Sequence, residues 1–331
     1  MYTSTNFNIN SCTMKKILII RLSSLGDVIH TFPMVYDIKK NKPEYEIDWL
    51  VDENFKDIVK LTPNVNKIIS IPLRRWKANK IAAIFEFIKW KKSIKDRNYE
   101  HIIDAQGLVK SAIFTKIFKG IVHGLGKYSI KEKLANRFYN YSYETGREYL
   151  ATTKNRLLAS QIFGYKIDIE KVNFGLTFKS KVNPIKPKYV VFFHATSKDS
   201  KKYSKNNWAT LADYLVKVYN LDVVLPYGNA DEKLDAESIK NIAESSKITV
   251  CERILNYNEI ADLITHAQFI FGVDTGLIHL ANALNKKLIA IFTDSDPQKT
   301  GVFESGIAKN IGSQGKAPLV SDIIDLFEKI K

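Results

Sequence analysis

The length, composition and charge of the chain exclude several classes of protein. It has 331 residues, of which 45% are hydrophobic and 26% charged, and 50 Lys and Arg face 35 Asp and Glu, for a formal net charge of +15. The size favours two domains, and the composition excludes a disordered or fibrous chain. The positive charge indicates an anionic partner but does not choose among nucleic acid, phospholipid and a phosphorylated substrate.

Apolar runs, the first residues and the cysteines bear on the cellular compartment of the protein. No apolar run approaches the ~20 residues that span a bilayer. Residues 1–13 are polar and lack the features of a signal peptide, so we expect a polar leader before a fold that begins at Met14. Cys12 and Cys251 offer neither a disulfide framework nor metal-ligand spacing, which fits a reducing cytoplasm.

Short β-rich runs alternate with helical patterns from Lys15 onward. In chain order we expect the strand KILIIR, a helix from about Gly26 to Lys39, the strand EIDWLV, a further helix, the strand KIISI, a long helix and the strand HIIDA. This alternation predicts a parallel sheet covered by helices.

The same rhythm restarts after a proline-containing stretch, 174–188, which we expect to be a linker. The expected elements are YVVFFHA, a helix near Trp208 to Val218, DVVLPYG, a helix, KITV, a helix, QFIFGVD, a helix, LIAIFT and a last helix from Ser321 to Lys331. The sequence therefore predicts an α/β protein with two Rossmann-like, doubly wound parallel-sheet domains, 14–178 and 185–331, facing across a cleft. The last helix could pack on either domain.

Polar residues follow the first predicted strand. In open parallel sheets, ligands bind beyond the carboxyl ends of the strands, where helix N-termini point backbone N–H groups at anions. The stretch RLSSLGD places Asp27 there, in the first turn of a helix. Asp at such a position is often only a helix cap, but Asp27 is also a candidate general base, although the helix dipole lowers the pKa of such a carboxyl.

Two polar stretches in the second half indicate a phosphate site. In VDTGLIHLANAL, a strand ends at Asp274, Gly276 permits close approach, and His279 lies one turn into a helix. The helix amides suit a pyrophosphate, and the alternative is an Asp cap with a structural His. The loop HATSKDSKKYSKNNW could stabilise a leaving diphosphate, or be a solvated lysine-rich loop. Its candidate residues are Thr196, Ser197 and Lys201.

A basic stretch with interleaved apolar residues lies in the first half. Its cations are Arg74, Arg75, Lys77, Lys80, Lys89, Lys91, Lys92, Lys95 and Arg97, and its apolar residues include Ile81, Ile84, Phe85, Ile88 and Trp90. A basic amphipathic helix resting on an anionic membrane fits, as does a helix with one core face and one lysine face. A nucleic-acid site ranks lower because no nucleic-acid-binding motif accompanies the charge.

Several motifs in one order resemble the inverting heptosyltransferases of the GT-B fold, in particular the lipopolysaccharide heptosyltransferase I branch. They are KKILIIRLSSLGDVIHTFP, IDWLVDENF, RRW, IDAQGLVKSA, HATSKD, LPYG and VDTGLIHL. The resemblance implies transfer of L-glycero-D-manno-heptose from ADP-heptose to the inner Kdo of Kdo2-lipid A, with inversion and without a metal or other cofactor. It also implies peripheral contact with the anionic cytoplasmic face of the inner membrane.

The resemblance assigns roles to individual residues. Asp27 would be the general base, and Lys201 would offset the charge on departing ADP. The implied donor-binding residues are Thr196, Ser197, Lys201, Glu232, Leu255, Asp274, Thr275, Gly276 and His279. The implied acceptor-binding residues are Ser24, Arg74, Arg75, Lys77, Gln106 and Lys131.

Three alternatives stay open at this point. A sister heptosyltransferase would extend an existing heptose, and a nucleotide-sugar epimerase of the same fold would interconvert a soluble sugar nucleotide without a lipid. A basic module that binds phosphate or nucleic acid without catalysis is supported only by the net charge. The oligomeric state does not follow from the sequence.

Overall fold

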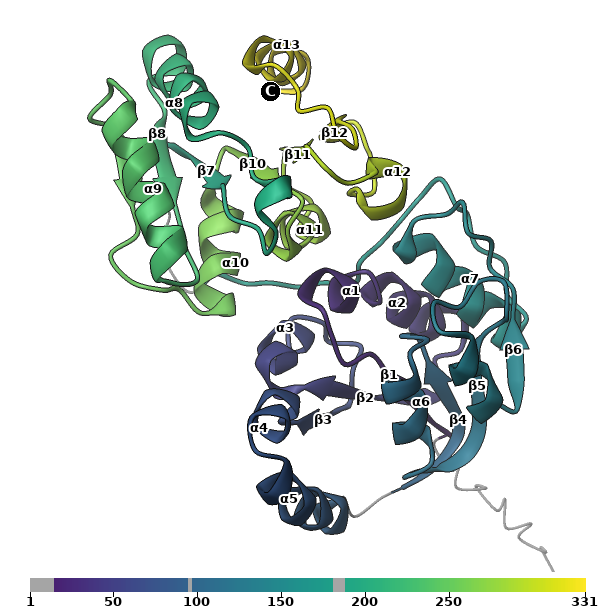
Figure 1. Ribbon diagram of the computed structural model, residues 1–331. Helices are drawn as coiled ribbons and strands as arrows, with labels where there is room; N and C mark the ends of the chain where they lie inside the picture. The colour runs from purple at the N-terminus through teal and green to yellow at the C-terminus, as the bar shows by residue number, and fades with distance from the viewer. Residues whose placement is uncertain (1–14, 95–96, 181–187) are drawn as a thin grey trace, which may run out of the picture.

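The computed structural model describes residues 15–94, 97–180 and 188–331. The predicted leader, 1–13, lies outside this range, as do Lys95 of the basic stretch and part of the predicted linker, so the exact domain limits stay predictions. The described strands form two six-stranded sheets, each covered by helices, as Figure 1 shows. In the described part of the chain, no helix is long and apolar enough to cross a bilayer.

The first sheet has the strand order β3-β2-β1-β4-β5-β6, and its strands pair in parallel. Its strands are β1 (Lys15–Ile20), β2 (Tyr45–Asp52), β3 (Lys67–Ile71), β4 (Asn98–Asp104), β5 (Lys119–Leu125) and β6 (Tyr141–Tyr143). The helices of this lobe are α1 (Leu25–Ile29), α2 (Phe32–Asn41), α3 (Lys56–Val59), α4 (Leu73–Ala78), α5 (Lys80–Ser93), α6 (Val109–Thr115) and α7 (Ala151–Phe163).

The second sheet, β12-β11-β10-β7-β8-β9, has the same order when its strands are numbered within their own half. Its strands are β7 (Tyr189–Phe193), β8 (Asp222–Leu225), β9 (Ile248–Val250), β10 (Phe269–Val273), β11 (Leu288–Phe292) and β12 (Ala308–Gly312). Its helices are α8 (Lys205–Tyr219), α9 (Ala230–Ile242), α10 (Tyr257–His266), α11 (Gly276–Ala283), α12 (Pro297–Thr300) and α13 (Val320–Ile330). The predicted fold class, two doubly wound parallel sheets, is confirmed.

Two predicted helices are broken in the structure. The helix expected from Gly26 to Lys39 is divided into α1 and α2. Pro33, in the first turn of α2, has no N–H to donate to the carbonyl four residues earlier, so one continuous helix cannot form there. The long helix expected after KIISI is divided into α4 and α5 at Asn79, whose side chain accepts a hydrogen bond from Ala82 N at 3.0 Å and caps α5.

Three strands near the sheet edges escaped the sequence analysis: β5, β6 and β12. The first residues of β5 are exposed, β6 is a short tyrosine-rich segment, and β12 contains Lys309 and Asn310. Such strands have solvent on one side, so they lack the continuous apolar runs that mark β1 or β10 as buried strands.

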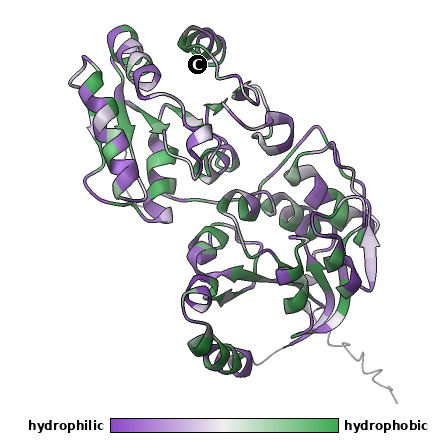
Figure 2. Cartoon of the chain, viewed as in Figure 1, coloured by the Kyte–Doolittle hydropathy of each residue, from purple (hydrophilic) through white to green (hydrophobic). Residues whose placement is uncertain are grey.

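The last helix, α13, packs on the second lobe, one of the two positions that the sequence left open. Ile323 and Phe327 are buried in the core of the second sheet, and the ring of Phe327 lies 4.9 Å from that of Phe269. The hydroxyl of Tyr214 in α8 donates to Glu328 at 2.9 Å. In Figure 2, hydrophobic residues predominate in the central strands, and helices such as α9 carry both hydrophobic and hydrophilic residues.

Helix α7 carries polar residues that attach it to α1 and α2. Arg156 Nε donates to Asp37 Oδ2 at 2.7 Å, and both side chains are buried. Burial raises the pKa of the Asp37 carboxyl, and the Arg156 guanidinium opposes that rise. Asn155 Nδ2 donates to the carbonyl of His30 at 3.0 Å, at the junction of α1 and α2. These contacts hold the α1–α2 unit in place on its sheet.

The two lobes meet where α1 packs against α11. A methyl group built on Gly276 would lie 2.6 Å from Leu25 Cγ, and one built on Gly26 would lie 3.1 Å from His279 Cδ2. The rings of His30 and His279 meet edge to face with centroids 4.3 Å apart. Glycine is therefore needed at Gly276 because a larger residue would separate the helices.

Replacing Arg156 by Met tests the buried ion pair. The change leaves Asp37 buried without its cation, so we expect the free energy of unfolding, measured in urea, to fall by about 3–5 kcal/mol. The matched control is Lys60→Met, which removes an exposed pair with Asp57 at the same N···O distance of 2.7 Å. Its expected loss is below about 1 kcal/mol. Similar losses for both variants would contradict the structural role of the buried pair.

The Gly276→Ala variant tests the contact between the lobes. Overpacking against Leu25 is expected to lower the free energy of unfolding by about 1–3 kcal/mol. Leu25→Ala in the same chain removes Cγ and Cδ2, two of the three close atoms, and leaves Cβ at 2.7 Å, so the double variant should lose less than the sum of the single losses. Gly306→Ala is the control, since nothing lies within 4 Å of its added methyl. Strictly additive losses would count against the contact.

Candidate functional site

The shared strand order places the candidate residues at equivalent points of the two sheets. In each sheet the chain winds in opposite directions from two neighbouring central strands, β1 and β4 in the first and β7 and β10 in the second. Ligands bind at such switch points, beyond the carboxyl ends of the strands. Asp27 and Gln106 follow β1 and β4, whereas Thr196 and Asp274 follow β7 and β10. The contact between α1 and α11 brings these two edges together.

Asp27 occupies the first turn of α1 and has defined partners. Its Oδ2 accepts hydrogen bonds from Ser24 N at 2.9 Å and Ser24 Oγ at 3.0 Å. Its Oδ1 lies 3.2 Å from Nη2 of Arg21, which is buried and also donates to the carbonyl of Ala105. The side chain of Asp27 nevertheless stays 44% exposed. The carboxylate is therefore a helix cap and is also accessible to a ligand.

The environment of Asp27 keeps it ionised. Burial tends to raise the pKa of this carboxyl, but the Arg21 guanidinium and the hydrogen bonds from Ser24 outweigh burial and hold the pKa below its usual range. The carboxylate can thus accept a proton only while one is being released by a reacting hydroxyl.

In the second lobe, Lys201 and Asp274 form a charged pair. Lys201 Nζ lies 2.6 Å from Asp274 Oδ2, and Ser295 Oγ donates to the same oxygen at 2.6 Å. Thr196 Oγ1 donates to the backbone carbonyl of Asp274 at 2.9 Å. Asp274 therefore fixes the position of the lysine beside α11. The sequence analysis missed Ser295, because nothing in the stretch TDSDP indicates that its hydroxyl reaches back to β10.

Helix α11 begins beside this pair. Thr275 is its N-cap residue and makes no side-chain cap hydrogen bond, so the Thr275 hydroxyl does not occupy the first amides of the helix. Such amides, together with the helix dipole, favour an anion. The exposed Ser197 lies in the loop after β7 that also carries Lys201.

His279 and His30 are neutral at physiological pH. Burial lowers the pKa of His279 to about 4, and burial together with the neighbouring His279 lowers that of His30 well below its usual range. Both rings are buried, and His30 Nδ1 lies 2.7 Å from Thr152 Oγ1. His279 can thus offer an N–H group to a ligand but no positive charge. Its observed contacts are with Gly26 and His30 in the other lobe.

The predicted nucleotide residues lie at the start of α9 and α10. The Glu232 carboxylate accepts from Gly228 N at 2.7 Å and from Asn229 Nδ2 at 2.9 Å, which orients it at the end of β8. His194 Nε2 lies 3.0 Å from the carbonyl of Glu232 and ties α9 to the end of β7. Leu255 is half-buried, next to the N-cap of α10.

On the acceptor side, Gln106 supports the loop that carries Asp27. Its Oε1 accepts from Leu22 N at 2.8 Å, so its predicted contact with a substrate competes with a structural role. Lys110, which the sequence analysis missed, lies at the start of α6 with Nζ 3.3 Å from Ser23 Oγ. The exposure of Lys110 and its contact with Ser23 make it an additional candidate cation beside Asp27.

The remaining predicted acceptor residues are exposed cations. Arg75 Nη2 lies 3.1 Å from Glu53 Oε2, which anchors α4 to the turn after β2. Arg74 and Lys77 are exposed on the same helix, and Lys131 is exposed in the loop after β5. No hydrogen bond or ion pair between described residues joins these cations to Asp27, so their binding roles stay predictions.

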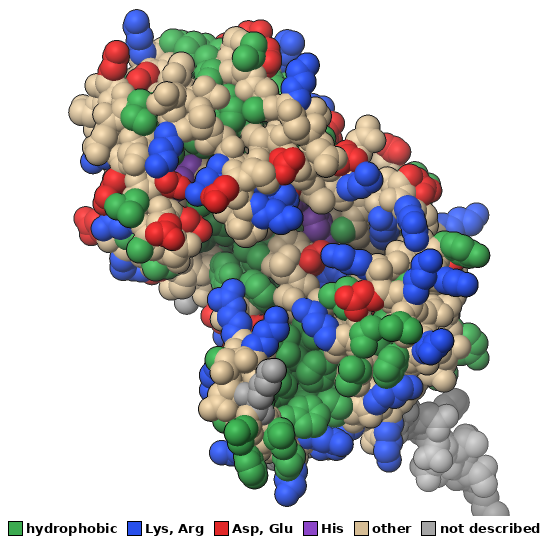
Figure 3. Space-filling model, in the orientation of Figure 1, with side chains coloured by type: hydrophobic (Ala, Val, Ile, Leu, Met, Phe, Trp, Pro, Cys, Tyr) green, Lys and Arg blue, Asp and Glu red, His purple; other side chains and the backbone are tan. Residues whose placement is uncertain are grey.

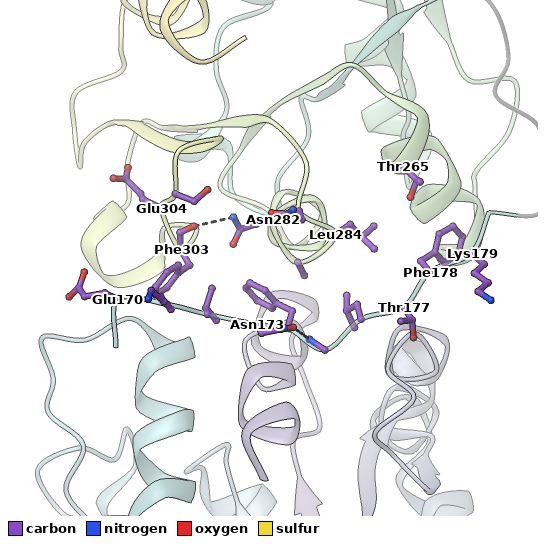
Figure 4. Close-up of a pocket in the computed structure, with 18 residues that line it drawn as sticks. Glu170, Asn173, Thr177, Phe178, Lys179, Thr265, Asn282, Leu284, Phe303 and Glu304 are labelled. Atoms are coloured by element: carbon purple, nitrogen blue, oxygen red, sulfur yellow. Dashed lines mark hydrogen bonds between the residues drawn. The ribbon is translucent and has the colours of Figure 1, made fainter. Parts of the chain in front are cut away.

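The structure also contains a cavity of about 840 Å³ away from the predicted residues. Figure 4 shows it between the linker and the C-terminal end of α11, with Asn173, Phe178, Asn282 and Phe303 on its walls. It shares α11 with the candidate site but none of the predicted site residues. In residues 15–94, 97–180 and 188–331, no three His, Cys, Asp or Glu side chains form a group able to hold a metal ion.

Known proteins resemble the chain along nearly all of its length. The family model of glycosyltransferase family 9 (heptosyltransferase) matches residues 87–321. Lipopolysaccharide heptosyltransferase 1 of Salmonella typhimurium is 32% identical over 300 residues, 89% of this chain and 92% of that protein. Lipooligosaccharide heptosyltransferase 2 of Haemophilus influenzae is 25% identical over 304 residues, 86% of this chain and 85% of that protein.

A solved structure agrees with these matches. The structure of the E. coli heptosyltransferase WaaC with ADP has a TM-score of 0.87 and 26% identity, and the match covers 96% of this chain and 100% of that chain. The resemblance found in the sequence motifs is thereby confirmed. The chain belongs to glycosyltransferase family 9, the heptosyltransferases, and is a glycosyltransferase of the GT-B fold.

Proposed function

We propose that the chain transfers L-glycero-D-manno-heptose from ADP-heptose to the inner Kdo of Kdo2-lipid A, in lipopolysaccharide inner-core biosynthesis. The observation that carries the proposal is the placement of an ionised, accessible carboxylate, Asp27, and a fixed cation, Lys201, at the two strand edges that face each other. The similarity to lipopolysaccharide heptosyltransferase 1 and to WaaC with ADP supports the ADP-linked heptose donor and a role in lipopolysaccharide synthesis.

The proposed chemistry is a single displacement. Asp27 takes the proton of the Kdo hydroxyl as the hydroxyl oxygen attacks the anomeric carbon of the heptose. The bond from that carbon to the diphosphate oxygen breaks on the opposite face, so the configuration inverts and ADP leaves with the electron pair. Lys201, the hydroxyls of Thr196 and Ser197 and the first amides of α11 stabilise the negative charge that grows on the diphosphate.

The pairing with Asp274 limits the positive charge that Lys201 can offer to the departing ADP. Part of the lysine charge is offset by Asp274 at 2.6 Å, so Lys201 acts on ADP from a fixed position rather than as a free counter-ion. The uncharged hydrogen-bond donors of α11 and of the loop after β7 supply the rest of the stabilisation of the diphosphate charge. We propose that these groups replace a bound metal ion, and that the enzyme needs no cofactor.

The proposed acceptor determines the proposed location. The glycan head of Kdo2-lipid A projects from a membrane, so the enzyme would work in the cytoplasm, on the cytoplasmic face of the inner membrane. The exposed cations of α4 would meet acceptor phosphates and carboxylates. The anionic acceptor and membrane would account for the net charge of +15, so no nucleic-acid partner is needed to explain it.

The central test is an assay of ADP release and lipid mass with ADP-heptose and Kdo2-lipid A in the presence of EDTA. We expect one heptose to be added per acceptor. Asp27→Asn keeps an acceptor for the Ser24 amide but removes the base, so kcat should fall by roughly 10²–10⁴ while ADP binding is retained. A product only with a heptose-bearing acceptor would favour a sister heptosyltransferase, and a need for added divalent ions would refute the metal-free chemistry.

The pH dependence of kcat/KM tests the environment of Asp27. Ser24→Ala removes a hydrogen bond to the ionised carboxylate, so the pKa of Asp27 should rise and the acid limb of the profile should move to higher pH. Ser23→Ala is the matched control because its hydroxyl contacts Lys110 and not Asp27. An unchanged acid limb in Ser24→Ala would argue against Asp27 as the titrating base.

A further inference from the structure

Helix α5 is attached to the first lobe by one apolar face. The rings of Phe87 and Trp90 lie 5.8 Å and 5.9 Å from that of Trp76, and Trp90 lies 6.0 Å from Phe114 of α6. Trp90 Nε1 donates to the carbonyl of Ser70 at 2.9 Å. This inner face holds the helix against the sheet without using its other apolar residues.

A second apolar row lies on the outside of the same helix. Ile81, Ile84, Phe85 and Ile88 are 76%, 62%, 72% and 46% exposed. Their spacing of three, four and seven residues places them on one continuous stripe. Four large apolar side chains in one exposed row cost free energy in water, and such a patch usually marks an interaction surface.

The surroundings of this row are basic. Lys89, Lys91 and Lys92 are exposed on α5, and the exposed cations of α4 precede them in the chain. The single carboxylate in the sequence of α5, Glu86, accepts a hydrogen bond from Trp76 Nε1 at 3.1 Å on the inner side. In Figure 3, hydrophobic side chains gather at the lower end of the first lobe with Lys and Arg at their border.

We propose that α5 lies in the interfacial region of an anionic phospholipid bilayer, with its outer row, Ile81, Ile84, Phe85 and Ile88, embedded among the acyl chains and its lysines among the headgroups. Apolar burial and attraction to anionic lipid add in such helices. A second copy of the chain fits this row less well than a bilayer does, because two copies facing each other would bring their lysines together.

The inference rests on the proposed function and gives its membrane partner a defined contact. Asn79 ends α4 and caps α5, so the two helices are directly joined. With α5 embedded, Arg74 and Arg75 of α4 are placed at headgroup level, where a lipid-borne acceptor presents its phosphates. The embedded row therefore orients the acceptor side of the cleft toward the membrane.

The first test is co-sedimentation of the full chain with vesicles of phosphatidylglycerol and phosphatidylethanolamine. We expect the double variant Ile84→Gln and Phe85→Gln to bind at least about tenfold more weakly, because both side chains lose their apolar burial. The control, Val218→Gln with Ile242→Gln, changes residues of the second lobe that are 53% and 46% exposed, and should bind like the unaltered chain. Lys89→Gln with Lys92→Gln should bind more weakly and with a shallower salt dependence.

The second test separates this inference from the proposed function. Ile84→Gln with Phe85→Gln should retain ADP release with a deacylated, water-soluble acceptor and lose it with the acceptor embedded in vesicles. An unaltered chain that is inactive with both acceptors would refute the proposed function, while the vesicle binding would still test the inference. Unchanged vesicle binding by the variant would overturn the inference, as would a change in oligomeric state by ultracentrifugation without a change in vesicle binding.

Discussion

The close approach of α1 and α11 is the constraint on which the rest of the site depends. Each helix starts at the switch point of its own sheet, so the distance between the two helices sets the distance between Asp27 and the Lys201–Asp274 pair. The approach is possible because Gly276 leaves room for Leu25 and Gly26 leaves room for His279. A side chain at either glycine would enter space that the other lobe already occupies.

Charge at the two facing strand edges is arranged within each lobe before any substrate arrives. The guanidinium of Arg21 helps to keep Asp27 ionised, and the carboxylate of Asp274 fixes the position of Lys201. The two histidines between the lobes add no positive charge, because burial keeps both neutral at physiological pH. A substrate therefore meets fixed donors and acceptors, which lowers the reorganisation needed during the reaction.

Sequence patterns predicted the central strands and the residues that follow them. β1, β7 and β10 end in fully buried apolar runs, and β4 ends in the buried residues Ile102, Ile103 and Asp104. The polar residues after these strands follow directly in the chain. The edge strands and the helix breaks were harder to predict from the sequence. β6 and β12 are partly exposed to solvent, and Pro33 and Asn79 interrupt helical patterns that otherwise continue. Local pattern fails where an element is only partly buried.

The sequence by itself determined the two parallel sheets, the family resemblance and Asp27 as a candidate base, because each depends on residues that are neighbours in the chain. Only the tertiary structure decided that Ser295 reaches Asp274, that His279 packs on His30, and that the outer row of α5 is exposed. These features join residues far apart in sequence or depend on which face of a helix the rest of the molecule covers, and a linear pattern contains neither kind of information.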